Sequence, residues 1–393
     1  MGGVKKMHLI VFFTYGISLK VWSETGLLDR EISLYERLVD KGVKVAFITF
    51  GDERDYSYLE KIIDIEIIPF YEYSKKPNSK VISLFHSLLL PFILKEKIKE
   101  ADMLKTNQMW GSWVAIISKY LYRKKLIIRC GYEWYRNTFL RRKYGGTGRS
   151  IIAHLVFKIF GFFLEFVSYQ VADRVIISNL SDFQFVRRTF KIKSEKIDLV
   201  RNYIDTDLFK PVSNVAKKDK RLLYIGRLDP RKNVFALLKA LDGIDVCLDI
   251  IGEGTHEGEL KDFVKDHGLN VNFLGVFSNN ELPEIINKHC IFILPSLYEN
   301  NPKSLLEAMA CGCAVIGSEV DGIKEIVRHY ENGLLCGTDA ESIREAILTL
   351  MRDKSLRNKV GKNARMFVLK NCDLEEIVEK EYKLYKELVT ECS

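Results

Sequence analysis

Short apolar runs alternate with segments of helical periodicity along the first half of the chain. The runs LIVFF, KVAFITF, KLIIRC and RVIIS have the length and composition of buried strands. Between the first two lies LLDREISLYERLVDKG, in which Leu28, Ile32, Tyr35, Leu38 and Val39 share one face of a helix. Strands that alternate with helices are typical of βα units and a parallel sheet.

The alternation stops at a polar stretch, VSNVAKKDK, and restarts in the second half. The strand-like runs there are RLLYIG, VCLDIIG, VNFLG, IFILPS and AVIGS, separated by helices such as FALLKAL and SLLEAMACG. We therefore predict an α/β fold of two doubly wound, Rossmann-like domains. Ligands of such sheets bind at the carboxyl ends of the strands, so we expect a site in a cleft between the domains.

Length and composition agree with two globular domains. The chain has 393 residues, of which 47% are hydrophobic and 28% charged, and single cores rarely grow beyond about 250 to 300 residues. Eight cysteines are scattered without a CxxC pair or the spacing of a zinc site. We interpret them as buried thiols of a reducing compartment.

Two apolar segments imitate membrane-directed signals. The N-terminal run is only HLIVFF and no cleavage site of small residues follows it, so a first strand explains it better than a signal peptide. Residues 151–172 are more apolar, but His154, Lys158 and Glu165 interrupt them. Because a spanning helix needs about 20 nearly uncharged residues, we expect a buried or membrane-surface helix there.

The positive charge of the chain is concentrated in its first half. The net charge is +8, yet residues 1–200 carry 33 Lys and Arg against 21 Asp and Glu, a balance of +12, and residues 201–393 have a balance of −4. A basic half suits an anionic lipid surface, a nucleic acid or an acidic substrate. A basic face that is simply solvated explains the imbalance equally well.

A loop in the second half carries two cations next to a predicted helix start. In LLYIGRLDPRKN, Gly226, Arg227 and Lys232 lie between a strand and a helix that we expect to begin near Asn233. Cations at a helix N-terminus, where backbone N–H groups point outward, make an anion site suited to a diphosphate. An ordinary solvated loop fits the same residues equally well.

Two carboxylates flank the start of a later helix. Pro302 fits the first turn of a helix, so we expect a helix that begins just after it and ends at Gly312. Glu299 then precedes the helix, and Glu307 lies inside it among apolar neighbours, where a carboxylate needs donors. Both carboxylates could accept hydrogen bonds from sugar hydroxyls. The alternative is that Glu307 lies on the wet edge of the helix.

Several motifs of the second half occur together in an order that resembles a known family. Glu299-x7-Glu307 followed by AMACGCAVIGS, with GRLDPRKN, IIGEG, VNFLG and FILPSLYE, is similar to the C-terminal domain of the family 4 glycosyltransferases, which have the GT-B fold. LVRNYIDTDLFKP and, less sharply, TGLLDREISLYERLVDKGVKV extend the resemblance to most of the chain. It implies an acceptor-binding domain at 1–204, a nucleotide-sugar-binding domain at 205–372, and a helix at 373–393 that returns to the first domain.

The resemblance also implies a role for each motif side chain. Arg227 and Lys232 would hold the donor's diphosphate, Glu307 the ribose hydroxyls and Glu299 the transferred sugar, so that Arg227, Lys232 and Glu299 are the expected catalytic residues. The other expected donor-binding residues are Gly226, Lys303, Ser304, Leu305, Gly275 and Gly26. The cations would stabilise the leaving diphosphate in place of a metal ion, so neither a metal nor a cofactor is expected. Retention of anomeric configuration is implied too, by same-face attack with the donor phosphate as base.

The chain departs from the family pattern at four places. It has Glu299-Asn-Asn-Pro where the family usually has Glu-Gly-Phe-Gly, so the loop that faces the sugar differs. Thr25 and Asp321 each replace a glycine, and Cys130 stands where members often carry a histidine. The last departure argues against a His-assisted mechanism.

The acceptor is expected in the basic first half. RCGYEWYRNTFLRRKYGGTGR mixes cations with aromatic rings, which stack on sugars or rest at lipid interfaces. We name Arg129, Tyr132, Glu133 and Arg136 as candidate acceptor contacts. The segment lacks a recognised nucleic-acid-binding module, so nucleic acid is not an expected partner.

Two further motifs are interpreted as coincidences. DTD at 205–207 spells an Asp-x-Asp metal motif but sits at the mouth of the interdomain linker. IIGEGTHEG nearly spells a dinucleotide fingerprint, with its last glycine one residue late and no convincing acidic partner.

We therefore predict a retaining glycosyltransferase that moves a hexosyl unit from a UDP- or GDP-sugar to a lipid-linked or saccharide acceptor in cell-surface polysaccharide synthesis. It would work in the cytoplasm, peripheral on the inner face of the cell membrane. Two other classes fit the same motifs: a GT-B-fold nucleotide-sugar epimerase, which would convert the donor without an acceptor, and a sugar-nucleotide-binding protein, which would release no nucleotide.

Overall fold

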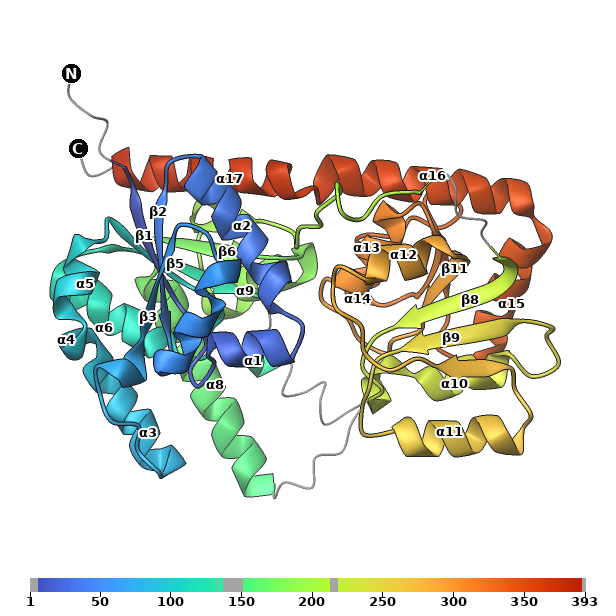
Figure 1. The fold of residues 1–393 in the computed structure, drawn as a ribbon, viewed down its shortest axis with the longest axis horizontal. Helices are drawn as coiled ribbons and strands as arrows, with labels where there is room; N and C mark the ends of the chain where they lie inside the picture. The colour runs from blue at the N-terminus through green and yellow to red at the C-terminus, as the bar shows by residue number, and fades with distance from the viewer. Residues whose placement is uncertain (1–5, 132, 137–150, 213–217, 391–393) are drawn as a thin grey trace. The chain divides into compact units, whose positions relative to one another are not determined.

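The chain divides into two compact units, each built on its own parallel sheet (Figure 1). The computed structural model describes residues 6–131, 133–136, 151–212 and 218–390. Unit 1 comprises the described residues up to Arg136, residues 151–200 and those from Ile377 onward, and unit 2 comprises the described part of Arg201–Glu376.

The boundaries between the units differ slightly from the predicted 204/205 and 372/373. Ile204 pairs with the segment that follows the last helix of unit 2: its N–H donates to Cys372 O at 2.8 Å, and its own carbonyl accepts from Leu374 N–H at 3.0 Å. This bridge ties the segments around Ile204 and Leu374 to unit 2. The first boundary therefore lies after Val200 and the second after Glu376.

Unit 1 contains a seven-stranded parallel sheet in the order β3-β2-β1-β4-β5-β6-β7. The strands are β1 (His8–Phe12), β2 (Lys44–Thr49), β3 (Ile65–Pro69), β4 (Met103–Thr106), β5 (Lys125–Cys130), β6 (Arg174–Ile177) and β7 (Ile197–Leu199). The order reverses between β1 and β4, so the loops that follow these two strands meet: Tyr15 N–H donates to Trp110 O at 3.0 Å.

The helices of unit 1 include the one expected after the first strand. In α2, Leu28, Ile32, Tyr35 and Leu38 are buried as predicted, whereas Val39 is half-buried. The helices of this unit are α1 (Leu19–Glu24), α2 (Leu28–Asp40), α3 (Lys80–His86), α4 (Leu90–Ile93), α5 (Lys95–Glu100), α6 (Ser112–Tyr122), α8 (Ile151–Val171), α9 (Leu180–Phe190) and most of α17 (Leu374–Thr390), with short 3₁₀ segments η1 (Glu53–Lys61), η2 (Phe70–Glu72), η3 (Ser87–Leu89) and η4 (Ser194–Lys196).

A buried charged cluster holds α17 in unit 1. The Lys105 ammonium on β4 donates to the Glu381 carboxylate and, at 2.9 Å, to the Tyr385 hydroxyl, both on α17. The rings of Tyr35 and Tyr385 lie 5.2 and 5.6 Å from this ammonium. The side chains of Lys105 and Glu381 are 0% and 2% exposed, so the last helix is anchored by an interior ion pair as well as by its apolar stripe.

Unit 2 has a six-stranded parallel sheet in the order β10-β9-β8-β11-β12-β13. Its strands are β8 (Lys218–Ile225), β9 (Cys247–Ile251), β10 (Val271–Phe273), β11 (His289–Leu294), β12 (Ala314–Ser318) and β13 (Leu334–Cys336). Its helices are α10 (Val234–Ala240), α11 (Glu257–Asp266), α12 (Leu282–Asn287), α13 (Lys303–Ala310), α14 (Asp321–Lys324), α15 (Ala340–Arg352) and α16 (Lys354–Asn371), with η5 (Pro230–Lys232). The order reverses between β8 and β11, which makes the loops after these two strands the place where ligands of this fold class bind.

Candidate functional site

Three glycines pack the backbone tightly at the carboxyl edge of the unit 2 sheet. Gly226 N–H donates to Ile251 O at 2.9 Å, and Gly252 N–H donates to Gly275 O at 2.7 Å. A Cβ on Gly252 would lie 2.0 Å from Gly226 O, so a larger residue is excluded there. Gly226 and Gly275, both expected at the donor site, are therefore held close together by the backbone at Ile251 and Gly252.

The loop after β8 presents the predicted cations. Asp229 caps η5: its carboxylate accepts from Arg231 N–H at 3.0 Å and from the Arg231 guanidinium at 2.8 Å. The Arg227 guanidinium lies 3.7 Å from Asp229 but is 70% exposed, which leaves it available to an anion. Burial by itself would raise the pKa of Asp229, but Arg231 and Arg227 lower it below its ordinary value, so this carboxylate is charged.

Asn233 joins this loop to two others. It adopts a left-handed conformation with φ of 56°, which asparagine tolerates. Its amide donates to Pro295 O at 3.1 Å, after β11, and to Thr338 O at 2.8 Å, after β13. Leu297 N–H also donates to Arg231 O at 2.7 Å. The loops that follow three strands are thus bonded into one surface.

Lys232 and Glu299 form a half-buried ion pair at the centre of that surface. Their side chains are 17% and 11% exposed, and the Lys232 ammonium donates to the Glu299 carboxylate. Ser296 O–H donates to the same carboxylate oxygen at 2.7 Å. The two residues predicted to contact diphosphate and sugar are therefore brought together, but each neutralises the other before a ligand arrives.

The helix α13 follows the prediction closely. Pro302 is its N-cap, Lys303 its first residue, and Gly312 follows the C-cap with φ of 67°. The first N–H groups of a helix, here those of Lys303, Ser304 and Leu305, have no intrahelical acceptor. Glu307 is 1% exposed, so the wet-edge interpretation is wrong. Its predicted contact with a ribose stays a prediction.

Gly322 fixes the position of the Glu299 loop. A Cβ on Gly322 would lie 2.2 Å from Asn300 O and 2.3 Å from Glu299 O, so the start of α14 supports the backbone that carries the carboxylate. Asn202 supports the same loop from another side, because its amide donates to Asn301 O at 2.9 Å. These contacts hold the unusual Glu-Asn-Asn-Pro turn.

Two positioning residues, Tyr224 and Ser296, were not predicted. Tyr224 is fully buried and its hydroxyl donates to Arg227 O at 2.8 Å. Ser296, also fully buried, bonds Glu299 as described, and its own carbonyl accepts from the Ser318 hydroxyl. Both residues act through hydrogen bonds to the backbone or side chain of motif residues. Spacing along the sequence does not reveal such contacts.

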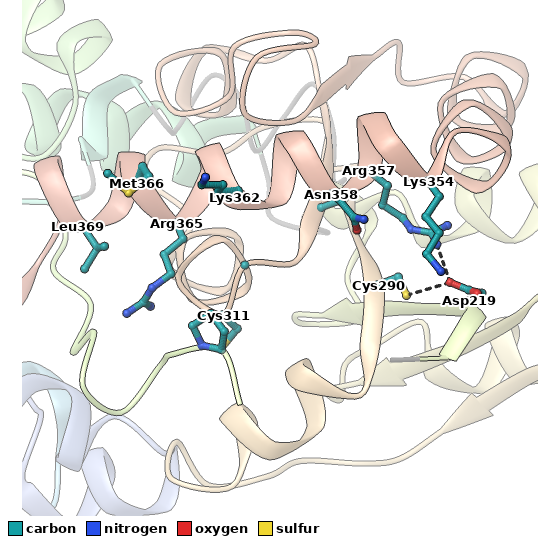
Figure 2. A pocket seen from close by; sticks show the side chains of 13 residues that line it. Asp219, Cys290, Cys311, Lys354, Arg357, Asn358, Lys362, Arg365, Met366 and Leu369 are labelled. Atoms are coloured by element: carbon teal, nitrogen blue, oxygen red, sulfur yellow. Dashed lines mark hydrogen bonds and ion pairs between the residues drawn. The ribbon is translucent and has the colours of Figure 1, made fainter. Parts of the chain in front are cut away.

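A large cavity in unit 2 lies away from these residues. Its volume is about 480 Å³, and it is lined by α16 side chains such as Lys354 and Arg357 together with Asp219 and Cys290 (Figure 2). Asp219 and Cys290 are near the starts of β8 and β11. The cavity therefore opens at the amino edge of the sheet, opposite the edge that carries Arg227 and Glu299, and the topology argues against it as the donor site.

The candidate acceptor residues of unit 1 are mostly engaged in internal bonds. Arg129 is 9% exposed, with its guanidinium 3.6 Å from Glu31. Arg136 donates to Asp182 at 2.6 Å and to Ser181 at 2.8 Å. Tyr132 lies outside the described residues. These side chains hold β5 and α9 in place, and an acceptor contact by any of them stays a prediction.

Glu133, the remaining candidate acceptor contact, is an interior residue. It is 0% exposed, and Tyr169 O–H donates to its two oxygens at 2.9 and 2.7 Å. Burial raises the pKa of Glu133 well above its ordinary value, and the Glu165 and Asp182 carboxyls raise it further. Burial likewise raises the pKa of Glu165 to about 8, although the N–H groups of Tyr135 and Trp134 oppose it.

Three remaining motif residues have local structural explanations. Gly26 has φ of 67° and terminates α1, and its N–H donates to Ser23 O at 3.1 Å. The Asp205 carboxylate of DTD accepts from the N–H groups of Asp207 and Leu208, both at 3.0 Å. Gly254 of IIGEG is required because a Cβ there would lie 2.3 Å from Leu228 O.

Comparison with solved structures defines the fold. Sucrose-phosphate synthase from Thermosynechococcus elongatus matches 98% of this chain along 100% of its own, with a TM-score of 0.79 and 20% identity. The two doubly wound units therefore form the GT-B fold, as predicted. Residues 205–367, within unit 2, match the model of the family described as glycosyl transferases group 1.

Curated relatives match different lengths of the chain. An N-acetylgalactosamine-N,N'-diacetylbacillosaminyl-diphospho-undecaprenol 4-alpha-N-acetylgalactosaminyltransferase from Campylobacter jejuni is 30% identical over 52% of this chain and 59% of its own length. This chain thus spans less than two thirds of that relative. The N,N'-diacetylbacillosaminyl-diphospho-undecaprenol alpha-1,3-N-acetylgalactosaminyltransferase of the same organism is 24% identical over 91% of this chain and 94% of its own.

Proposed function

We propose that the protein is a retaining glycosyltransferase that moves a hexosyl unit from a UDP- or GDP-sugar to a lipid-linked saccharide acceptor. The observation that carries the proposal is the Lys232–Glu299 pair beside the exposed Arg227, at the carboxyl edge of the unit 2 sheet. Opposite charges in that arrangement suit a ligand with an anionic diphosphate next to sugar hydroxyls.

Donor binding would exchange the partners of this ion pair. The diphosphate takes Lys232 and Arg227, and a sugar hydroxyl donates to the Glu299 carboxylate that Lys232 has left. Ser296, which bonds Glu299 at 2.7 Å, keeps the carboxylate oriented during the exchange. Until the donor arrives, each half-buried charge is therefore compensated by the other.

The transfer step breaks the bond between the anomeric carbon and the diphosphate oxygen and forms a bond from an acceptor hydroxyl on the same face. The hydroxyl proton passes to the departing diphosphate. Arg227 and Lys232 stabilise the charge that develops on this leaving group, the role that a metal ion fills elsewhere. We expect transfer to continue in the presence of EDTA.

The acceptor class is supported by what the relatives are named for. Both Campylobacter jejuni proteins are transferases acting on a diphospho-undecaprenol-linked sugar. We infer a lipid-linked acceptor of the same chemical class, met at the cytoplasmic face of the cell membrane. The second of these relatives matches nearly the whole chain, including unit 1, which is the expected acceptor-binding part.

The experiment is a nucleotide-release screen with UDP- and GDP-sugars, with and without an undecaprenyl-diphosphate-linked sugar, coupled to detection of the glycosylated lipid. We expect acceptor-dependent release with at least one donor. Lys232→Ala and Glu299→Gln should each lower kcat about 10²- to 10³-fold, because each removes a group that meets charge or a hydroxyl in the transition state.

Lys220→Ala is the matched control. Lys220 is a 65% exposed cation at the amino edge of the same sheet, paired with Asp245, and its loss should leave kcat unchanged. Donor conversion without acceptor would indicate an epimerase. Tight donor binding without nucleotide release under any acceptor would indicate a binding protein, and either result would overturn the proposal.

A further inference from the structure

An apolar groove crosses the surface of unit 1 between three helical segments. Its volume is about 420 Å³. Side chains of α3 and η3, α6, and α8 line it, and all of them are apolar: Leu84, Phe85, Leu88, Trp113, Phe160 and Phe163 are representative. The indole N–H of Trp113 donates to Ser87 Oγ at 2.9 Å, so its polar group is satisfied and the ring faces the groove as hydrocarbon.

The apolar surface continues beyond the groove along both of its walls. On α3, Val81, Ile82 and Phe85 are 61 to 65% exposed. On α8, Val156, Ile159 and Phe163 are 50 to 59% exposed, and Leu155, Phe160 and Val167 extend the same face. A soluble monomer rarely exposes so large a contiguous apolar face without a partner. Figure 1 shows α3 and α8 projecting from the same side of unit 1.

The helices that form this face are too short or too interrupted to cross a bilayer. Among the residues described, no helix has the length and apolar character of a membrane span. Of α3 and α8, α8 is the longer, with 21 residues. Lys158 lies within it, and its Glu165 is buried in the interior of unit 1. A partner that covers this face must therefore meet it from outside, as an interfacial layer does.

Charge around the face identifies the partner. Between Glu72 and Glu96 the sequence has no acidic residue, and the exposed Lys75, Lys76 and Lys80 lie in the loop before α3 and at its first residue. Between Glu133 and Glu165 the sequence again has no acidic residue. A hydrocarbon face with lysines at one end, in sequence segments that carry no acidic residue, complements a bilayer with anionic headgroups.

We propose that α3 and α8 insert together into the interfacial layer of an anionic lipid bilayer, with acyl chains filling the groove and the lysines at α3 among the headgroups. Exposed Phe, Ile and Val side chains enter the boundary between headgroups and acyl chains by about 5 to 10 Å, the depth that interfacial helices reach. The insertion deepens the proposed function, because it names the surface at which unit 1 meets a lipid-linked acceptor.

The test is flotation of the full chain with vesicles of phosphatidylcholine containing phosphatidylglycerol, without donor or acceptor. We expect binding that rises with the phosphatidylglycerol fraction. Ile159→Asp and Ile82→Asp should each weaken it about ten-fold or more, since a carboxylate must be drawn into the acyl region. Lys75→Glu should weaken it about five-fold or more. Vesicles with brominated acyl chains should quench tryptophan fluorescence, because Trp113 lines the groove.

The matched controls lie elsewhere on unit 1. Ile63→Asp makes the same change at a 68% exposed isoleucine, and Lys61→Glu reverses an exposed charge beside it; both should bind vesicles as the wild type does. Background binding by the wild type, or equal binding by Ile159→Asp and Ile63→Asp, would overturn the proposal. So would a dimer in solution that Ile159→Asp dissociates, because a second copy would then cover the face. Transfer to a water-soluble acceptor needs no vesicle, so its persistence or loss reports on the proposed function separately.

Discussion

Removing one carboxylate from the last helix should destabilise unit 1 far more than removing its neighbour two residues earlier. Glu381 and Glu379 both lie on α17 and both receive a hydrogen bond from a lysine ammonium of unit 1, Lys105 and Lys41 respectively. The two ion pairs differ in burial: the side chains of the first are 0% and 2% exposed, and those of the second are 25% and 61% exposed.

The magnitudes follow from that difference. Glu381→Gln leaves an interior ammonium without its counter-charge, which costs about 3 to 5 kcal/mol. Glu379→Gln removes a surface pair worth about 0 to 1 kcal/mol. For a domain of this size, the melting temperature should fall by roughly 6 to 20 °C in the first variant and by no more than about 4 °C in the second.

The assay is thermal and urea unfolding followed by circular dichroism, with binding of a nucleotide sugar as a separate check on unit 2. A third variant, Lys105→Met with Glu381→Leu, replaces both charges by apolar groups and should recover much of the loss. Equal effects of Glu381→Gln and Glu379→Gln would refute the reasoning, as would a double variant no more stable than the single one.

The same pair sets a pH dependence. Burial would raise the pKa of Glu381, but the Lys105 ammonium and the Arg129 guanidinium hold it below its ordinary value. A carboxyl with a lowered folded pKa stabilises the protein above its unfolded pKa and loses that contribution as the pH falls through the folded pKa. Acid should therefore release α17 from unit 1, and Glu381→Gln should abolish that acid transition.

Three further predictions concern other buried groups. The pKa of Glu165, about 8 when folded, lies above its unfolded value of about 4.3. The stability that its proton contributes is therefore lost progressively as the pH rises from about 4.3 through 8. Glu165→Gln should flatten the fall of melting temperature over that range, and parallel profiles of the two proteins would contradict this. Gly322→Ala, whose Cβ would meet the Glu299 loop at 2.3 Å, should weaken calorimetric donor binding roughly ten-fold, whereas Gly258→Ala, with nothing within 4 Å, should not. Tyr224→Phe should lower stability by about 1 kcal/mol in urea unfolding, because it removes one buried hydrogen bond; an unchanged midpoint would count against that bond.

The fold could be predicted from the sequence where strands are long and continuously apolar. The runs that became β2, β5, β8, β9 and β12 stand out because both faces of a parallel strand are buried. The strands β3, β4, β7 and β13 were not identified. β4 contains Lys105, a charged residue inside a fully buried strand, and β7 and β13 have only three residues each.

The candidate site was predictable to the extent that it depends on spacing along the chain. The start and end of α13 followed from Pro302 and Gly312 alone. The ion pair between Lys232 and Glu299 did not, because 66 residues separate them and only the pairing of β8 with β11 brings their loops together. The interior position of Glu133 depends on packing by Tyr169, which no local pattern reports.

Because residues 377–390 complete unit 1, the earlier segments of that unit cannot finish folding until these later residues have been synthesised. Lys105 gains its ion-pair partner Glu381 only 276 positions later in the sequence. Leu374–Thr390, which carries Glu381, is the final helix of the described chain. Unit 2, whose described segments lie between, can close first. In a nascent chain stalled before α17, unit 2 should therefore resist protease while unit 1 remains sensitive to it.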